Sequence, residues 1–305
     1  MTTDAKAKAN VNLGVWPRVD GYVANLKPIP FGAQFWRVWR PLWQLRHKVN
    51  GLLFPFLLMC WGSLLVAIPY MVVNGLAAGT DHTSISEETK TQRHTLKVSQ
   101  QDERTAWDPK SLFHDSEGHY LDYKIPFIDW TFFFYCSLYF YYCGFFVSQK
   151  NDRGRSESLV TAQAWILSTL IACLFFVLWP ADVDLRWQIV DAGGLEGSYA
   201  IFYKLMHAID KPFNAWPCLH ITTSFIFAVA LTRWWFQRGC NWAVYLLWSA
   251  WVGLFVSVLT TKQHFIWDAI TGTLLGLVIW LGVMRPAFRY LDSLPDEQLP
   301  LSKLS

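Results

Sequence analysis

The chain has 305 residues, of which 53% are hydrophobic, 17% are aromatic and only 16% are charged. Soluble domains carry about 25% charged residues, and a surplus of Trp, Phe and Tyr is typical of membrane interfaces. This composition excludes a disordered chain, a coiled coil and a secreted disulfide framework. The net charge of +3, with its basic residues dispersed, gives no footprint for nucleic-acid binding.

Apolar segments without Asp, Glu, Lys or Arg follow a polar N-terminus. Each is about 20 residues or longer, which at about 1.5 Å per residue is enough to cross a hydrocarbon core of about 30 Å. The six segments, the last interrupted only by an aspartate, are 51–80, 130–149, 158–181, 212–232, 239–261 and 263–284. We therefore predict an all-α polytopic membrane protein, built as a bundle of six transmembrane helices.

An even number of spans places both termini on one side of the membrane, and basic residues in the short loops indicate which side. Two short loops, 148–157 and 233–238, carry five basic residues, which are Lys150, Arg153, Arg155, Arg233 and Arg238. We therefore predict cytoplasmic N- and C-termini. The alternate loops then face the periplasm, the cell exterior or a lumen, in a bacterial inner membrane or a eukaryotic organelle membrane.

Three regions follow from these spans. Residues 1–50 form a cytoplasmic segment whose stretch 31–48 mixes tryptophans with arginines. That mixture is typical of a segment lying along the membrane interface, although an ordinary anchored tail fits equally well. The membrane domain covers 51–285, and 286–305 is a cytoplasmic tail. Within the membrane domain, residues 79–127 form a polar outer loop that is too long for a simple connector.

Two of the eight histidines stand apart, because His220 and His264 each begin a membrane span. Both spans run inward from the outer face, so the two imidazoles are expected at the same outer depth. His207 lies in the outer loop before the fourth span and is a weaker candidate. The other histidines lie in polar segments and are expected to be solvated; they are His47, His82, His94, His114 and His119.

Asp268 follows His264 at the i, i+4 spacing, which places both on one face of a helix. A carboxylate in apolar surroundings is costly unless it is paired, so it indicates a functional site. A neutral imidazole attacks phosphorus when its second nitrogen donates to a carboxylate. His220 is then placed to protonate the leaving oxygen. The alternative is that both histidines are interfacial residues and Asp268 pairs with Lys262 or an amide.

Phosphoryl oxygens also need cations, and several basic residues are expected on the outer side. The candidates are Arg186, Lys204, Lys211 and Lys262. A metal is not expected to supply that charge, because the six cysteines lack metal-site spacing and the chain shows no clustered carboxylates. We predict no cofactor.

At these residues the chain resembles the type-2 phosphatidic acid phosphatase superfamily, whose members carry the motifs KxxxxxxRP, PSGH and SRxxxxxHxxxD. The second motif corresponds to Pro217-Cys218-Leu219-His220, and the third to Ser257, His264 and Asp268 at the family spacing. The resemblance covers roughly 160–285, with the motifs lying within 180–268. The six-span layout with cytoplasmic termini also fits.

The chain departs from the family pattern at each motif. Val258 replaces the arginine of the third motif, so that Lys262 is a candidate to replace its charge, and Cys218 replaces the serine of the second. The first motif is degraded to a stretch that contains Pro180 and Arg186. Leu219 of the second motif, the Lys262-Gln263-His264 stretch and the degraded first motif resemble the branch that contains inositol phosphorylceramide synthases.

The resemblance implies a role for each site residue. His264 is the nucleophile that carries a phosphohistidine, Asp268 orients it, and His220 protonates the leaving alcohol. Arg186, Lys262 and Lys211 bind phosphate without a metal. Four further residues are expected to shape the site without a direct catalytic role, namely Cys218, Asn214, Asp210 and Ser257.

These expectations favour a membrane enzyme that cleaves or transfers a phosphoryl group of a membrane lipid at the outer face. We lean towards a phosphatase, because water needs no dedicated acceptor pocket, and an inositol phosphorylceramide synthase-like headgroup phosphotransferase is the nearest alternative. Two further alternatives remain open. One is a non-catalytic scaffold or transporter of the same fold, and the other is a haem protein with His220 and His264 as axial ligands.

Overall fold

The computed structural model describes residues 8–11, 19–22, 28–78, 112–181, 183–209 and 214–299. Most of the predicted outer loop lies outside these residues, as do two predicted site residues, Asp210 and Lys211.

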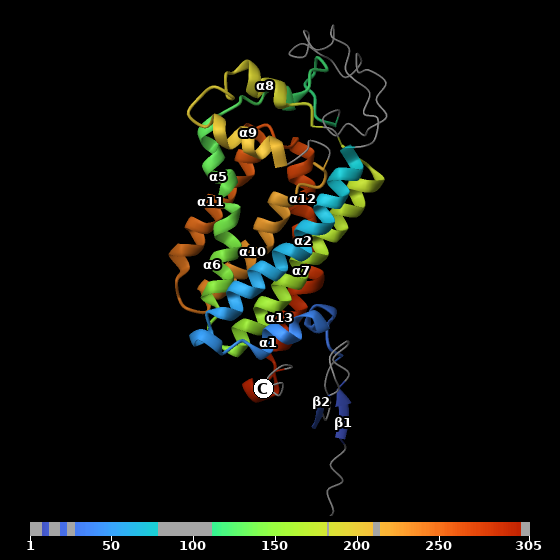
Figure 1. Cartoon of the computed structure of the whole chain (residues 1–305), viewed down its shortest axis with the longest axis vertical. Helices are drawn as coiled ribbons and strands as arrows, with labels where there is room; N and C mark the ends of the chain where they lie inside the picture. Colours follow the sequence, from blue (N-terminus) through green and yellow to red (C-terminus); the bar gives the residue numbers. More distant parts are fainter. Residues whose placement is uncertain are drawn as a thin grey trace, which may run out of the picture.

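The body of the protein is a bundle of helices, which confirms the predicted all-α membrane fold (Figure 1). A small antiparallel hairpin stands apart from it near the N-terminus, formed by β1 (Lys8–Val11) and β2 (Val19–Tyr22). Short helical turns then lead into the bundle. They are η1 (Phe31–Ala33), η2 (Arg37–Trp39), α1 (Arg40–Gln44) and η3 (Lys48–Gly51).

Most of the bundle consists of long apolar helices. These are α2 (Leu53–Ala78), α5 (Phe132–Cys136) with α6 (Leu138–Ser148), α7 (Asp152–Leu178), α10 (Leu219–Phe236), α11 (Asn241–Thr260) and α12 (Ile266–Ile279). The last continues through a π-helical turn, η8 (Trp280–Met284), into α13 (Arg285–Asp292), and η9 (Asp296–Gln298) follows. Five stretches are long and apolar enough to cross a membrane, namely Leu53–Leu76, Asp129–Ser148, Asp152–Leu178, Asn241–Thr260 and Ile266–Asp292.

The fourth predicted span, 212–232, corresponds to α10, which is not among these five. Polar residues in its first two turns, such as His220 and Thr223, and Arg233 near its end make it less apolar. The helix packs against α6, α7, α11 and α12, so much of its surface is covered by protein. Polar side chains of a membrane helix can face the interior of the bundle, where protein covers them. That α10 spans the membrane stays a prediction.

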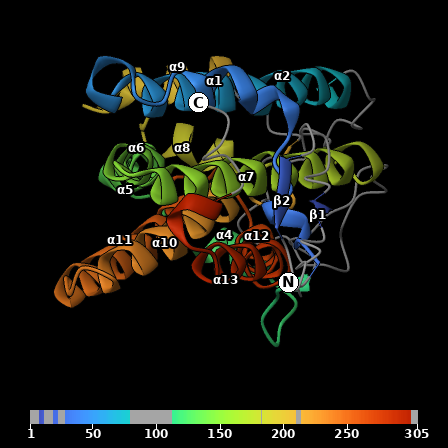
Figure 2. The same cartoon turned by 90° about the horizontal axis from the view of Figure 1, so that it is seen from below.

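The helices lie side by side around α7. Seen from below, α2 lies on one side of α7, and α10, α11, α12 and α13 lie on the other (Figure 2). In the most apolar part of α7, 67% of the residues are buried, against 11% in α2. The outward side chains of α2 include Phe56, Leu64 and Ile68, which are all exposed. Such a face is suited to lipid contact.

Charged residues at one end of the bundle form ion pairs. The helix α7 begins at Asp152, well inside the stretch that we expected to be a loop, and Asn151 Oδ1 caps it by accepting from the backbone N–H of Gly154 at 2.8 Å. Arg233 pairs with Glu157 at 3.1 Å and with Asp292 at 2.6 Å. Residues 152–157 of the expected loop 148–157 are therefore helical, and partners from other segments compensate their charges.

The aromatic stretch 31–48 packs against the bundle. Phe35, Trp39 and Trp43 are almost completely buried, and Trp39 Nε1 donates to Gln163 Oε1 of α7 at 3.0 Å. These three side chains contribute to the protein core instead of extending into lipid.

The opposite end of the bundle is covered by short helices, η7 (Asp129–Thr131), α4 (Leu121–Lys124), α8 (Arg186–Asp191) and α9 (Ala200–Ile209). Figure 1 shows α8 and α9 at the upper end, while α1 and α13 lie at the lower end. The helices α10 and α12 both begin at the covered end.

Candidate active site

The beginnings of α10 and α12 are held together by their backbones. Cys218 N donates to Asp268 O at 3.0 Å, and Thr222 Oγ1 donates to Gly272 O at 2.9 Å. A Cβ at Gly272 would lie 2.5 Å from the carbonyl oxygen of Cys218, so this approach requires glycine. The close contact brings together two motifs that are far apart in the sequence.

The turn between α11 and α12 positions His264. The backbone N–H groups of Gln263 and His264 both donate to Val258 O, each at 3.2 Å. His264 precedes the first residue of α12, Ile266, so our expectation that His264 and Asp268 share a helical face is wrong. The two side chains still approach each other. Asp268 Oδ2 accepts from Phe265 N at 2.9 Å, and this hydrogen bond holds the turn with His264 against the beginning of α12.

Two oxygen atoms face Nδ1 of His264. The carbonyl oxygen of Ala215 lies 3.1 Å away and Asp268 Oδ2 lies 3.6 Å away. The first distance is a hydrogen bond and the second is too long for one. Since both oxygens are acceptors, the proton of the neutral ring belongs on Nδ1. The lone pair then lies on Nε2, where a nucleophile needs it.

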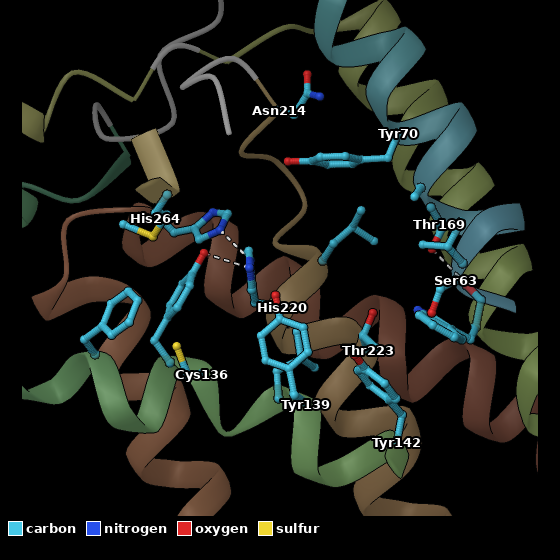
Figure 3. Close-up of a pocket in the computed structure, with 18 of the residues that line it drawn as sticks. Ser63, Tyr70, Cys136, Tyr139, Tyr142, Thr169, Asn214, His220, Thr223 and His264 are labelled. Atoms are coloured by element: carbon cyan, nitrogen blue, oxygen red, sulfur yellow. Dashed lines mark hydrogen bonds between the residues drawn. The ribbon is translucent and has the colours of Figure 1, made fainter. Parts of the chain in front are cut away.

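His264 Nε2 faces the other motif histidine. It lies 3.4 Å from Nδ1 of His220, and the two ring centroids are 5.5 Å apart (Figure 3). The predicted convergence of the two imidazoles is therefore present. A haem with both rings as axial ligands is not favoured, because its macrocycle would have to fit between these two facing nitrogens.

A tyrosine completes this chain of polar groups. The hydroxyl of Tyr135, from α5, lies 2.7 Å from Nε2 of His220. With Nδ1 of His264 protonated, the assignment that satisfies every neutral group is Tyr135 O–H to His220 Nε2, and His220 Nδ1–H to His264 Nε2. Both nitrogens of both histidines are then engaged. No sequence pattern singles out Tyr135, because it lies within an apolar run rich in aromatic residues.

Cys218 is the third reactive side chain at this point. It is fully buried, directly before α10, and its sulfur and one ring nitrogen each of His220 and His264 all lie within 4.8 Å of one another. The thiol therefore lies beside the histidine pair, where the family motif carries a serine.

Lys262 has a different environment from the one expected for a phosphate ligand. Its side chain is fully buried, and Nζ donates to the carbonyl oxygens of Asp122, at 3.3 Å, and Ile125. Burial lowers the pKa of Lys262 to about 8, while the charge of Asp122 acts in the opposite direction. Asp122 Oδ1 also accepts from Ile266 N at 2.7 Å. Both contacts attach the outer loop to the turn that carries His264, and the role of Lys262 in phosphate binding stays a prediction.

Arg186 lies at the first residue of α8, on the same end of the molecule as the histidines. Burial and, secondarily, the positive charge of Arg186 lower the pKa of His207 to about 4. His207 is therefore neutral near pH 7 and adds no cation for a phosphate. The predicted contact between Arg186 and phosphate stays a prediction, as does a contribution from Lys204, which is exposed on α9.

Ser257 and Asn214 shape the surroundings of the pair. Ser257 Oγ donates to Leu254 O within α11 at 2.7 Å, so its side chain stabilises the helix end. Asn214 is buried, and neither polar atom of its amide has a hydrogen-bond partner among the residues that the structure describes. A buried amide without a partner is unfavourable, so Asn214 is suited to receive a polar group of a ligand.

A cavity of about 670 Å³ extends from the histidines into the bundle (Figure 3). His220, His264 and Asn214 contribute to its wall. Most of the remaining wall is aliphatic or aromatic and comes from α2, α5, α6, α7 and α9, with residues such as Val66, Phe132, Leu138, Trp165 and Leu205. The cavity thus has a polar end, formed by His220, His264 and Asn214, and an apolar remainder. This combination is suited to an amphipathic ligand.

Comparison with known proteins supports the same interpretation. A family profile described as the PAP2 superfamily matches residues 118–282. This range includes every predicted site residue and the cavity-lining parts of α5, α6, α7, α9 and α10. Searches among curated proteins and among solved structures each found no match. The predicted likeness to inositol phosphorylceramide synthases is not tested by these findings.

Proposed function

Because the chain belongs to the PAP2 superfamily, we propose that it is a membrane enzyme that cleaves or transfers a phosphoryl group of a lipid through a phosphohistidine on His264. One observation carries the proposal. Two imidazole nitrogens, His264 Nε2 and His220 Nδ1, face each other at 3.4 Å at the head of an apolar cavity.

In the first step, the Nε2 lone pair of His264 attacks phosphorus. An N–P bond forms as the P–O bond to the lipid alcohol breaks, and His220 donates its Nδ1 proton to the leaving oxygen. His220 enters this step protonated on both nitrogens, with Nε2–H donating to the oxygen of Tyr135. The ring of His264 becomes cationic, and the nearby carboxylate of Asp268 stabilises that charge.

In the second step, water attacks the phosphohistidine. His220, now neutral, accepts a proton from the water, the N–P bond breaks, and inorganic phosphate leaves. An alcohol in place of water gives a phosphotransferase, with the phosphoryl group moved to the acceptor. No metal is needed in either step, because protonated groups and backbone dipoles stabilise the phosphoryl oxygens.

The cavity supports a lipid substrate. Its apolar walls would accommodate a hydrocarbon chain, and the phosphate of the same lipid would then lie beside His220 and His264 at the polar end of the cavity. Asn214 would then hydrogen-bond a polar group next to the phosphate, which relieves its lack of a partner among the described residues. We propose that this end of the bundle faces the periplasm or a lumen, since the basic loops and both termini are predicted on the cytoplasmic side.

The phosphotransferase is the second candidate. Leu219, the Lys262-Gln263-His264 stretch and the degraded first motif favour it, since they resemble the branch of inositol phosphorylceramide synthases. The two activities differ only in what resolves the phosphohistidine, so one experiment separates them.

Purified protein in detergent is incubated with lipid phosphates and phosphodiesters, with and without polyols such as inositol, and the products are identified by mass spectrometry. We expect inorganic phosphate and the dephosphorylated lipid for a phosphatase, or a new headgroup for a transferase. His264→Ala should abolish either product, while His114→Ala, a change of an exposed histidine outside the site, should not. Inactivity of the folded wild type on the whole panel would favour a non-catalytic scaffold or transporter.

A further inference from the structure

We propose that Cys218, His220 and His264 form a binding site for Zn²⁺ or another thiophilic divalent cation, and that the bound cation inhibits the enzyme. The metal site stands on geometry alone. The inhibition rests on the proposed function, because it follows from the role of His264 as nucleophile.

The spacing of the donor atoms fits a tetrahedral metal. Zn–N bonds of about 2.0–2.1 Å at the tetrahedral angle place two nitrogen ligands about 3.4 Å apart. The facing nitrogens of His264 and His220 are 3.4 Å apart. The sulfur of Cys218 belongs to the same cluster, in which all three donor atoms lie within 4.8 Å of one another. Only a small movement of the thiol completes three ligand positions.

The rings are already oriented as metal-bound histidines are. A ligating histidine almost always engages its second ring nitrogen with a carbonyl, a carboxylate or another polar group, which fixes its orientation and raises its basicity. His264 Nδ1 donates to Ala215 O at 3.1 Å, with Asp268 nearby, and His220 Nε2 lies 2.7 Å from the hydroxyl of Tyr135. When a metal binds, the neutral ring of His220 takes its other tautomer, with Nε2–H donating to the oxygen of Tyr135, so that the two facing nitrogens both offer a lone pair.

Cys218 supplies the selectivity for soft metals. A thiolate binds Zn²⁺ strongly and discriminates against Mg²⁺ and Ca²⁺, which prefer oxygen. Cys218 lies directly before α10, beside the histidine pair. A serine at this position, as in the family motif, would leave two nitrogens and a weak hydroxyl ligand. The site is therefore a property of this chain's own substitution.

Three protein ligands leave the fourth position of a tetrahedral metal open. Two of the three ligands, His220 and His264, border the cavity, so water or a phosphate oxygen can take that position from the cavity side. Coordination of His264 Nε2 occupies the lone pair that attacks phosphorus. The metal thus blocks formation of the phosphohistidine while leaving the fold intact.

Binding is tested with Co²⁺, which reports thiolate ligation by a near-ultraviolet charge-transfer band. Full-length protein in detergent should bind one Co²⁺ per chain with this band, and Zn²⁺ should displace it. Cys218→Ser should remove the band and weaken binding at least tenfold. Cys173→Ser, which changes a buried thiol of α7 outside the cluster, is the matched control and should retain both. A wild type without the band, or a band that survives in Cys218→Ser, would overturn the site.

Inhibition is tested separately, as the ratio of each variant's activity with and without Zn²⁺. We expect micromolar Zn²⁺ to inhibit the wild type, EDTA to restore it, and the inhibiting concentration to rise at least tenfold in Cys218→Ser. Bound metal without inhibition would overturn the proposed inhibition, whereas the proposed metal site would stand. Since the optical measurement needs no substrate, it decides the metal site even if no lipid is turned over, and a Cys218→Ser protein that fails to fold does not affect the wild-type spectrum.

Discussion

The hydroxyl of Tyr135, in α5, lies 2.7 Å from Nε2 of His220, in the first turn of α10. Tyr135 therefore orients the imidazole of His220. The contact leaves Nδ1 of His220 as the nitrogen that faces the phosphate position. A phenol can donate to the neutral ring and accept from the protonated one, and the second hydrogen bond is stronger because it is charge-assisted. Tyr135 is therefore a positioning residue for the general acid.

Tyr135→Phe should lower kcat about tenfold, the equivalent of one hydrogen bond, with little change in KM. Because the phenol favours the protonated form of His220, its loss should move the alkaline limb of the kcat profile to lower pH. Tyr141→Phe is the control, since its hydroxyl donates to Leu247 O at 3.3 Å away from the histidines. An unchanged pH profile in Tyr135→Phe, with reduced activity, would indicate a packing role only.

Asp268→Asn tests whether the carboxylate sets the tautomer of His264 or only supplies negative charge beside it. The carbonyl of Ala215, at 3.1 Å from His264 Nδ1, already fixes the tautomer, and Asp268 at 3.6 Å adds negative charge. We therefore expect kcat to fall about tenfold to a hundredfold, well below the roughly 10⁴-fold loss that follows a wrong tautomer. Steady-state kinetics at saturating lipid measures this, and a loss near 10⁴-fold would show that the carboxylate itself sets the tautomer.

Gly272→Ala should move the beginning of α12 away from the beginning of α10, and so separate His264 from His220. The new Cβ would lie 2.5 Å from Cys218 O, so α12 must move away from α10. Overpacking of this kind costs about 1–3 kcal/mol, and it should reduce activity strongly because it displaces His220 from His264. Gly144→Ala is the control, since no described atom lies within 4 Å of a Cβ at that position of α6. Thermal unfolding in detergent and activity report both effects, and wild-type activity in Gly272→Ala would contradict the role of this contact.

The spans and the histidine pair could be predicted from the sequence because they depend on simple patterns. Long charge-free runs define the apolar helices, and antiparallel order places His220 and His264 at the same end. The start of α7 could not be predicted, because the charges near Asp152 and Glu157 look like a loop until their partners Arg46 and Arg233 are placed beside them.

The finer geometry of the site depends on contacts that leave no local pattern. The acceptor for His264 is a backbone carbonyl, that of Ala215, and the partner of His220 is one of twelve tyrosines. The charge and outer position of Lys262 predict a phosphate ligand in place of the motif arginine, but they do not predict that its ammonium donates to carbonyls of the outer loop.

If His264 carries the phosphoryl group, rapid-quench trapping with a lipid phosphate labelled on phosphorus should isolate the phosphohistidine. We expect a base-stable, acid-labile label of up to one phosphate per chain, which mass spectrometry assigns to the peptide containing His264 and which His264→Ala lacks. A label on another residue, or an active enzyme in which His264→Ala is labelled as strongly as the wild type, would contradict this role of His264.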